Sequence, residues 1–170
     1  SASRQNLWRL TLIRLLIIAA QASTLGFAYL SDLLPLPWLP LALTLAASLS
    51  VCLLTALRLR TSWPVTELEY GVQLGCDLLL HSVLLYYTGG STNPFVSYYL
   101  VPLTIAAATL PWLYALILAG LALTGYTVLL IWYHPLHLLG IDHESTLISL
   151  HLFGMWLNFA LSAAFITFFV

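Results

Sequence analysis

From Leu78 to Ile141 the chain reads LLLHSVLLYYTGGSTNPFVSYYLVPLTIAAATLPWLYALILAGLALTGYTVLLIWYHPLHLLGI, without an Asp, Glu, Lys or Arg. An ionised side chain at the centre of a bilayer costs at least about 2.5 kcal/mol, so charged residues tend to mark the ends of membrane spans. This run is too long for one span of roughly 20 residues. Turn-forming residues divide it at 89–94, at Pro111 and at Pro135, because each proline removes a backbone donor.

The same rule divides the rest of the chain. Further charge-free segments run from Leu15 to Ser31, from Leu33 to Leu57 and from Ser145 to Val170. We therefore expect one all-α domain over 1–170, a six-helix transmembrane bundle with helices over 8–30, 38–57, 68–88, 95–110, 113–133 and 147–170.

The composition supports a membrane protein. Of the 170 residues, 61% are hydrophobic and 6% are charged, against about 25% charged in soluble domains. This composition excludes an ordinary soluble globule and a disordered chain. Five basic residues, all of them arginine, are too few for the basic face of a nucleic-acid binder.

The arginines predict the orientation in the membrane. Arg4, Arg9 and Arg14 precede or open the first predicted helix, and Arg58 and Arg60 follow the second. Because cytoplasmic loops carry the excess of basic residues, we expect both termini in the cytoplasm. The last residues are still typical of a span, so a cytoplasmic part is expected after Val170.

The connection before the third predicted helix carries a helix-start signal. Pro64 is followed by Thr66-x-x-Glu69, the pattern of a capping box. Acidic residues in the first turn also match the positive end of the helix dipole. A helix is therefore expected to begin near residue 67.

The loop over 89–95 reads Gly-Gly-Ser-Thr-Asn-Pro-Phe. Paired glycines let backbone amides approach a ligand, Asn93 offers a donor and an acceptor, and Phe95 offers a flat stacking face. These groups suit a quinone head, a planar ring with two carbonyl acceptors. A purely structural interpretation stays open, in which Asn93 caps the next helix with Pro94 at its first position and the glycines end the preceding helix.

This loop matches G-G-x-x-N-P-F at all five fixed positions. In the motif, and in its place between the third and fourth of six expected helices, the chain resembles the membrane part of RegB/PrrB-type redox-sensing histidine kinases, which include RoxS- and ActS-like members. The resemblance implies a homodimeric sensor in a bacterial inner membrane that binds ubiquinone. It implies quinone contacts from Gly89, Gly90, Asn93, Pro94 and Phe95.

The resemblance also implies a cytoplasmic, ATP-dependent kinase that phosphorylates its own histidine and passes the phosphate to a response regulator. In that family the phosphoacceptor histidine, the ATP-binding boxes and the redox-active cysteine belong to the cytoplasmic part. No catalytic residue is therefore assigned between Ser1 and Val170, and Cys52 and Cys76 are not equated with that cysteine.

Asp77 and His81 lie one turn apart on the predicted helix 68–88, so they share a face. Ionisable groups within a span are costly enough to suggest a functional role. A carboxylate beside an imidazole suits a quinol hydroxyl or a quinone oxygen, so we add both residues to the expected quinone site. The alternative is a polar contact between helices. The tyrosines around the loop are expected to be interfacial aromatic anchors, unless one reaches the ligand: Tyr86, Tyr87, Tyr98 and Tyr99.

A second polar cluster follows the fifth predicted helix and comprises His134, His137, Asp142, His143, Glu144 and His151. These are metal-ligand types, but their spacing matches no closed metal site, so no metal is expected. The alternative function is a small metal- or proton-dependent membrane transporter or enzyme that uses His134, His137 and His143. Such a protein would need more ionisable groups within its spans than Asp77 and His81.

Overall fold

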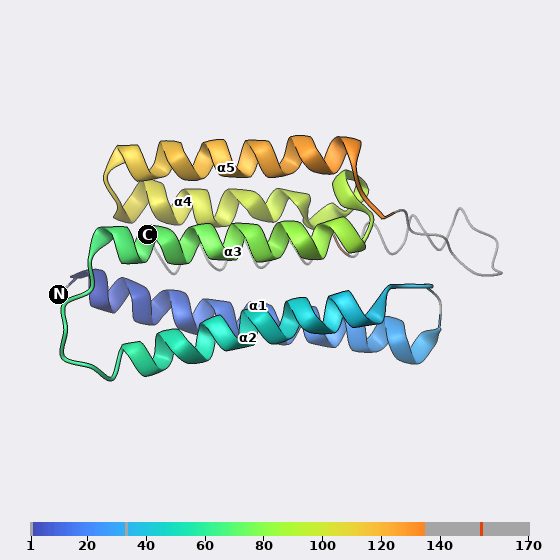
Figure 1. Cartoon of the computed structure of the whole chain (residues 1–170), viewed down its shortest axis with the longest axis horizontal. Helices are drawn as coiled ribbons and strands as arrows, with labels where there is room; N and C mark the ends of the chain where they lie inside the picture. Colours follow the sequence, from blue (N-terminus) through green and yellow to red (C-terminus); the bar gives the residue numbers. More distant parts are fainter. Residues whose placement is uncertain (1, 33, 135–153, 155–170) are drawn as a thin grey trace.

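The computed structural model describes residues 2–32, 34–134 and 154, and within these residues the chain is all-helical, without a β-strand (Figure 1). Five α-helices follow one another along this part of the chain: α1 (Ala2–Ser31), α2 (Trp38–Arg58), α3 (Glu67–Tyr87), α4 (Leu100–Thr109) and α5 (Trp112–Ile131). Two short 3₁₀ helices separate α3 from α4: η1 (Gly90–Thr92) and η2 (Pro94–Tyr99).

Four helices expected from the sequence, 8–30, 38–57, 68–88 and 113–133, are confirmed, and the sixth, 147–170, lies outside the described residues apart from Gly154. α1 begins at Ala2, six residues before the expected start, so Arg14 lies well inside the helix. The expected helix 95–110 is split into η2 and α4. Pro102 explains this difference, since it offers no N–H to the carbonyl of residue 98 and its ring disfavours a continuous α-helix there.

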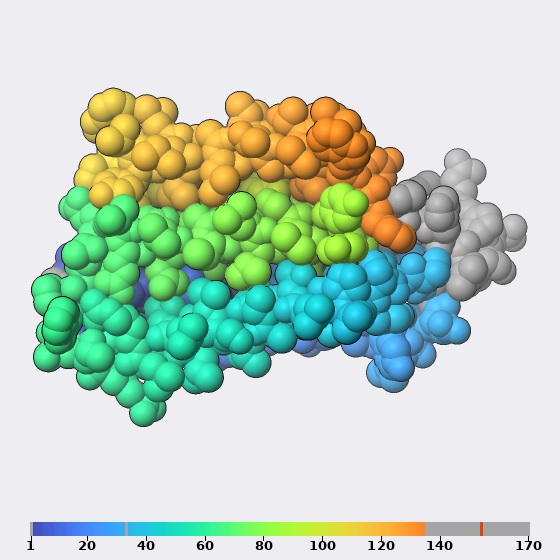
Figure 2. Space-filling view, in the orientation of Figure 1, coloured from blue at the N-terminus to red at the C-terminus, as the bar shows by residue number. Residues whose placement is uncertain are grey.

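Among the described residues three helices, α1, α2 and α5, are long and apolar enough to cross a membrane. Large apolar side chains cover the outward faces of these helices, among them Leu16, Leu43, Leu54, Leu113 and Leu123. Figure 2 shows α5, α3 and α2 side by side on one such face. An apolar exterior of this extent is typical of a protein that lipid surrounds.

α3 is the central helix, and it packs against α1, α2, α4 and α5. The bundle has two ends (Figure 1). We call one the arginine end, formed by the start of α1, the end of α2 and the segment 59–66, and the other the glycine-loop end, formed by residues 32, 34–37 and 88–94. α1 and α3 both begin at the arginine end and therefore run in the same direction.

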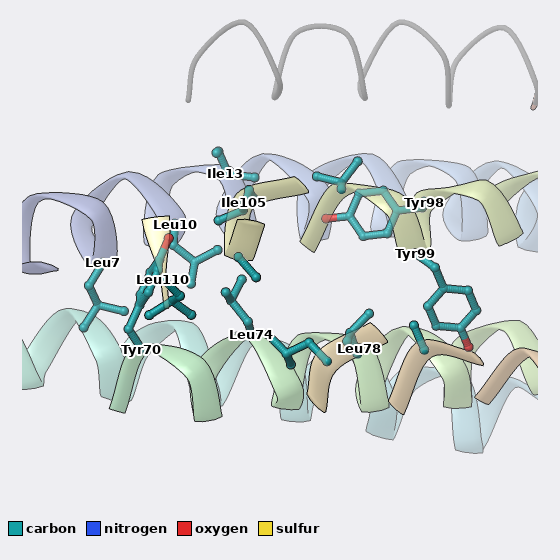
Figure 3. Packing of buried hydrophobic residues seen from close by; sticks show 14 of the residues in the cluster. Leu7, Leu10, Ile13, Tyr70, Leu74, Leu78, Tyr98, Tyr99, Ile105 and Leu110 are labelled. Atoms are coloured by element: carbon teal, nitrogen blue, oxygen red, sulfur yellow. The ribbon is translucent and has the colours of Figure 1, made fainter. Parts of the chain in front are cut away.

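The buried core lies where α1, α3 and α4 meet (Figure 3). Leu10 of α1, Leu74 of α3 and Ile105 of α4 are each at most 3% exposed. Tyr98 and Tyr99, expected to be interfacial anchors, belong to this core instead. They are buried because η2 folds back against α3 rather than extending α4 towards the membrane surface.

Polar contacts close the arginine end. Thr66 caps α3 as expected, because its hydroxyl accepts a hydrogen bond from the Glu69 backbone N–H at 3.1 Å. Arg58 forms an ion pair with Glu69 at 3.0 Å, and Arg4 donates to the Thr61 carbonyl at 2.8 Å. The starts of α1 and α3 and the end of α2 are thereby held together.

Candidate functional site

Both glycines of the 89–95 loop adopt conformations that side chains disfavour. Gly89 has φ 102° and ends α3, and Gly90 has φ 58°. A Cβ atom at Gly90 would overlap the Tyr133 side chain and lie 3.1 Å from the Leu129 carbonyl. The structural interpretation of the glycine pair is therefore confirmed: positive φ and a close approach to the end of α5 both require glycine.

The Asn93 side chain ties the loop together. Its Oδ1 accepts from the Phe95 backbone N–H at 2.9 Å, and its Nδ2 donates to the Thr88 carbonyl at 2.9 Å and to the Thr88 hydroxyl at 3.0 Å. Asn93 thus caps η2, with Pro94 at the first position of that helix. The expected capping role is confirmed, although the capped element is a 3₁₀ helix.

Gly154 is the one described residue beyond 134, and it lies against this loop. A Cβ atom built on Gly154 would be 2.6 Å from the Pro94 Cγ atom and 3.6 Å from the Phe95 Cε2 atom. Glycine is therefore needed where the later part of the chain meets the loop.

A cavity of about 170 Å³ lies beside the loop, between α1, α3 and the start of η2. Most of its wall is apolar, from Ile17, Ala20, Leu25, Ala28, Leu34, Leu36, Leu84, Leu85 and Phe95. The polar side chains on the wall are Gln21, Thr24, His81, Thr88, Asn93 and Tyr98. Thr24 is exposed on the outer face of α1, so the cavity reaches the surface that lipid would cover.

The size of this cavity matches a small ring. An apolar cavity of about 150 Å³ in another protein holds benzene. At about 170 Å³, this cavity has room for a six-membered ring, while a longer apolar tail would have to extend out of it. A mostly apolar wall with a few polar groups is the usual design of a small-molecule site.

The residues expected to bind quinone fall into two groups. Asn93, Phe95 and His81 line the cavity together. The other expected residues do not line it: Gly89, Gly90, Pro94 and Asp77. The glycines and Pro94 shape the loop, and Asp77 faces a different part of the bundle.

His81 is 6% exposed and stands at the base of the loop. Its Nε2 atom lies 3.0 Å from the Phe95 carbonyl oxygen. Its ring contacts the rings of Tyr98 and Tyr99, with centroids 4.7 and 5.5 Å away. The Nδ1 atom is buried and has no hydrogen-bond partner among the described residues.

Asp77 is paired with Arg14, a partner that sequence reasoning missed. Arg14 donates from Nε to Oδ1 at 2.7 Å and from Nη2 to Oδ2 at 2.8 Å. It also donates to the Thr55 hydroxyl at 3.1 Å and the Gln73 carbonyl at 3.4 Å. We call these residues the Arg14 cluster. The alternative interpretation of Asp77, a polar contact between helices, describes this geometry.

The observed helix starts place the two residues of this pair at similar depths. Arg14 lies about 18 Å along α1 and Asp77 about 15 Å along α3, at 1.5 Å per residue from the first residue of each helix. Opposite charges at equal depth on parallel helices favour pairing. Asp77 and His81 both line a second cavity of about 40 Å³.

Of the second polar cluster only His134 belongs to the described part of the chain. Its backbone N–H donates to the Tyr86 carbonyl at 2.8 Å, which joins the end of α5 to α3. His137, Asp142, His143, Glu144 and His151 lie outside the described residues. Comparison with known proteins adds no relative, since no family model, no curated protein and no solved structure matches this chain.

Proposed function

We propose that the chain is the quinone-binding transmembrane sensor domain of a two-component, redox-responsive histidine kinase. The observation that carries this proposal is the cavity of about 170 Å³ whose wall includes Asn93 and Phe95 of the G-G-x-x-N-P-F loop. The loop motif and a ring-sized space occur at the same place. A lipid-soluble ring is the ligand class that a mostly apolar cavity of this size favours.

The cavity wall also suits the ligand's tail. A membrane quinone carries a long apolar chain that is stable only in lipid or in an apolar groove. Thr24 is exposed at the edge of the cavity, on the helix that begins the bundle. We infer that the ring enters beside α1 and that the tail remains in the bilayer.

The proposal includes a topology. Arg4, Arg58 and Arg60 belong to the arginine end, which we place in the cytoplasm of a bacterium whose inner membrane holds six spans of this chain. The cavity then lies towards the outer leaflet. The kinase, its ATP site and the contact with a response regulator belong to a further cytoplasmic part, and the sensor acts as a homodimer.

A route for the signal is part of the proposal. Gly154 belongs to the expected sixth helix and lies against Pro94 and Phe95, which shape and line the site. A ligand shifts a conformational equilibrium only as far as it binds one state better than the other. A ring that displaces Phe95 would therefore be expected to displace the helix that leads towards the kinase.

A cavity-filling variant tests quinone binding. Ala20 lines the cavity, whereas Ala22 lies on the same helix and is exposed. We expect Ala20→Phe, in lipid nanodiscs, to bind decylubiquinone at least about tenfold more weakly than the wild type, because the new ring occupies the ligand's space. Ala22→Phe adds the same ring on the outer face and is expected to bind normally. Equal binding by both variants, or no binding by the wild type, would contradict the proposal.

A second test uses the full-length kinase. Asn93→Ala, Phe95→Ala and His81→Ala each alter the cavity wall, and each is expected to change how autophosphorylation responds to added quinone. A wild-type response in all three variants would remove the assigned site.

A further inference from the structure

The His81 side chain lines the ligand cavity, and its imidazole has an unused hydrogen-bonding atom. The residue is only 6% exposed, and it lines the cavity together with Phe95 and Asn93. Its Nδ1 atom has no partner within the described part of the chain. Buried polar atoms are nearly always hydrogen-bonded, so an unpartnered one on a side chain that lines a cavity points to a missing ligand group.

The structure determines which kind of group is missing. The Phe95 carbonyl oxygen, 3.0 Å from Nε2, can only accept, so Nε2 carries the proton. A neutral imidazole has one donor and one acceptor, and Nδ1 is therefore the acceptor. Arg14 occupies both carboxylate oxygens of Asp77, so no acid is left one turn away to pair with an imidazolium.

Four other polar side chains on the wall, those of Asn93, Thr24, Thr88 and Gln21, do not reverse this preference. Asn93 uses both amide groups within the loop. The hydroxyls of Thr24 and Thr88 donate to carbonyls of their own helices. Gln21 presents an amide with both a donor and an acceptor, which can pair with a carbonyl or a hydroxyl alike.

From this geometry we propose that the cavity selects the reduced, hydroxyl-bearing ring over the oxidised one, with a quinol O–H donating to the Nδ1 atom of His81. A quinone carbonyl has no hydrogen to donate and would leave Nδ1 unpartnered. The inference rests on the proposed quinone site and adds its redox preference. It makes His81 the residue that distinguishes the two forms, and the Phe95 carbonyl the group that holds the imidazole in the required tautomer.

The test compares two affinities on one preparation. In nanodiscs, under anaerobic conditions, we expect decylubiquinol to bind the wild-type chain about tenfold more tightly than decylubiquinone, the effect of one buried hydrogen bond. The hydroquinone with both hydroxyls methylated keeps the reduced ring but has no donor, so it is expected to bind as weakly as the quinone. Because both affinities are measured on the same sample, a fraction of misfolded protein affects them equally and does not change their ratio.

Two variants sharpen the test. His81→Phe keeps a ring and removes the acceptor, so the quinol-to-quinone affinity ratio is expected to fall to about one. His134→Phe makes the same substitution at a residue that does not line the cavity. The hydrogen bond that the His134 backbone N–H donates survives the change, so this variant is expected to keep the tenfold ratio. Equal affinities in the wild type, or an unchanged ratio in His81→Phe, would overturn the inference while leaving quinone binding intact. Binding of neither form would overturn the proposed function as well.

Discussion

The Arg14 cluster and the cavity beside the 89–95 loop both place polar groups inside the bundle. In the cluster these groups bind one another, whereas at the cavity His81 keeps a ring nitrogen without a partner among the described residues. Arg14 is 4% exposed and donates to two carboxylate oxygens, one hydroxyl and one carbonyl. His81 is 6% exposed, yet one of its two ring nitrogens has no partner among the described residues, and about 170 Å³ of space adjoins it. Asp77 of the cluster and His81 satisfy the same criterion in the sequence, an ionisable group within a predicted membrane segment.

The difference shows what distinguishes a structural polar group from a binding one in this chain. Where polar groups bind one another, as in the Arg14 cluster, they hold helices together. Where an acceptor is left over beside a cavity, the protein has capacity for a ligand. Asp77 therefore belongs to the framework, and His81, one turn further along α3, belongs to the site.

The largest expected effect comes from breaking the matched cluster. Asp77→Ala leaves the buried Arg14 guanidinium without its counter-ion, and removal of one partner of a buried ion pair costs about 3–5 kcal/mol. We expect the free energy of unfolding, measured in mixed micelles by titration with a denaturing detergent, to fall by that amount. Replacing both partners, by Arg14→Met with Asp77→Leu, is expected to recover most of the loss. A double variant as unstable as Asp77→Ala would show that the two charged groups stabilise the fold by more than neutralising each other.

A smaller effect is expected at Gly90, which shapes the loop without lining the cavity. Alanine at φ 58° is strained by about 1–3 kcal/mol, and its Cβ would also displace Tyr133. Gly120 is the control, because nothing lies within 4 Å of an added Cβ and alanine is the better helix former by about 1 kcal/mol. Gly90→Ala should lower thermal stability equally with and without quinol, and Gly120→Ala should not lower it. A loss of thermal stability in Gly90→Ala that appears only with quinol would show that Gly90 contributes to ligand binding.

The smallest effect on folding is expected at His81. His81→Phe gives up the hydrogen bond to the Phe95 carbonyl but also removes the unpartnered Nδ1 atom, so the net change is expected to be about 1 kcal/mol or less. The same detergent titration checks this value against Asp77→Ala. A loss comparable to that of Asp77→Ala would mean that His81, like Arg14, is chiefly a framework residue.

Much of the described fold could be predicted from the sequence, because charge-free runs and prolines mark helix limits in a bilayer. The starts of α2 and α3, the Thr66 cap and the Asn93 cap each follow from a local pattern. The burial of Tyr98 and Tyr99 could not be predicted in the same way. It depends on how η2 folds back against α3, and Pro102 was the available signal in the sequence.

The candidate site was predictable only in part. The motif pointed to Asn93 and Phe95, and the placement within a span pointed to His81, and these side chains do share a cavity. The Arg14–Asp77 pair was missed because it requires knowing that α1 and α3 are parallel neighbours. The bond between His81 and the Phe95 carbonyl was missed because a backbone carbonyl carries no signature in the sequence.

The central claim, that a ring occupies the space between α1, α3 and the 89–95 loop, can be tested by mapping where a photoreactive quinone labels the protein in nanodiscs. The account predicts adducts within 17–28 of α1 and within 93–98, with labelling suppressed by excess decylubiquinol. Adducts confined to the outward faces of α2 and α5, or labelling that decylubiquinol does not suppress, would contradict it.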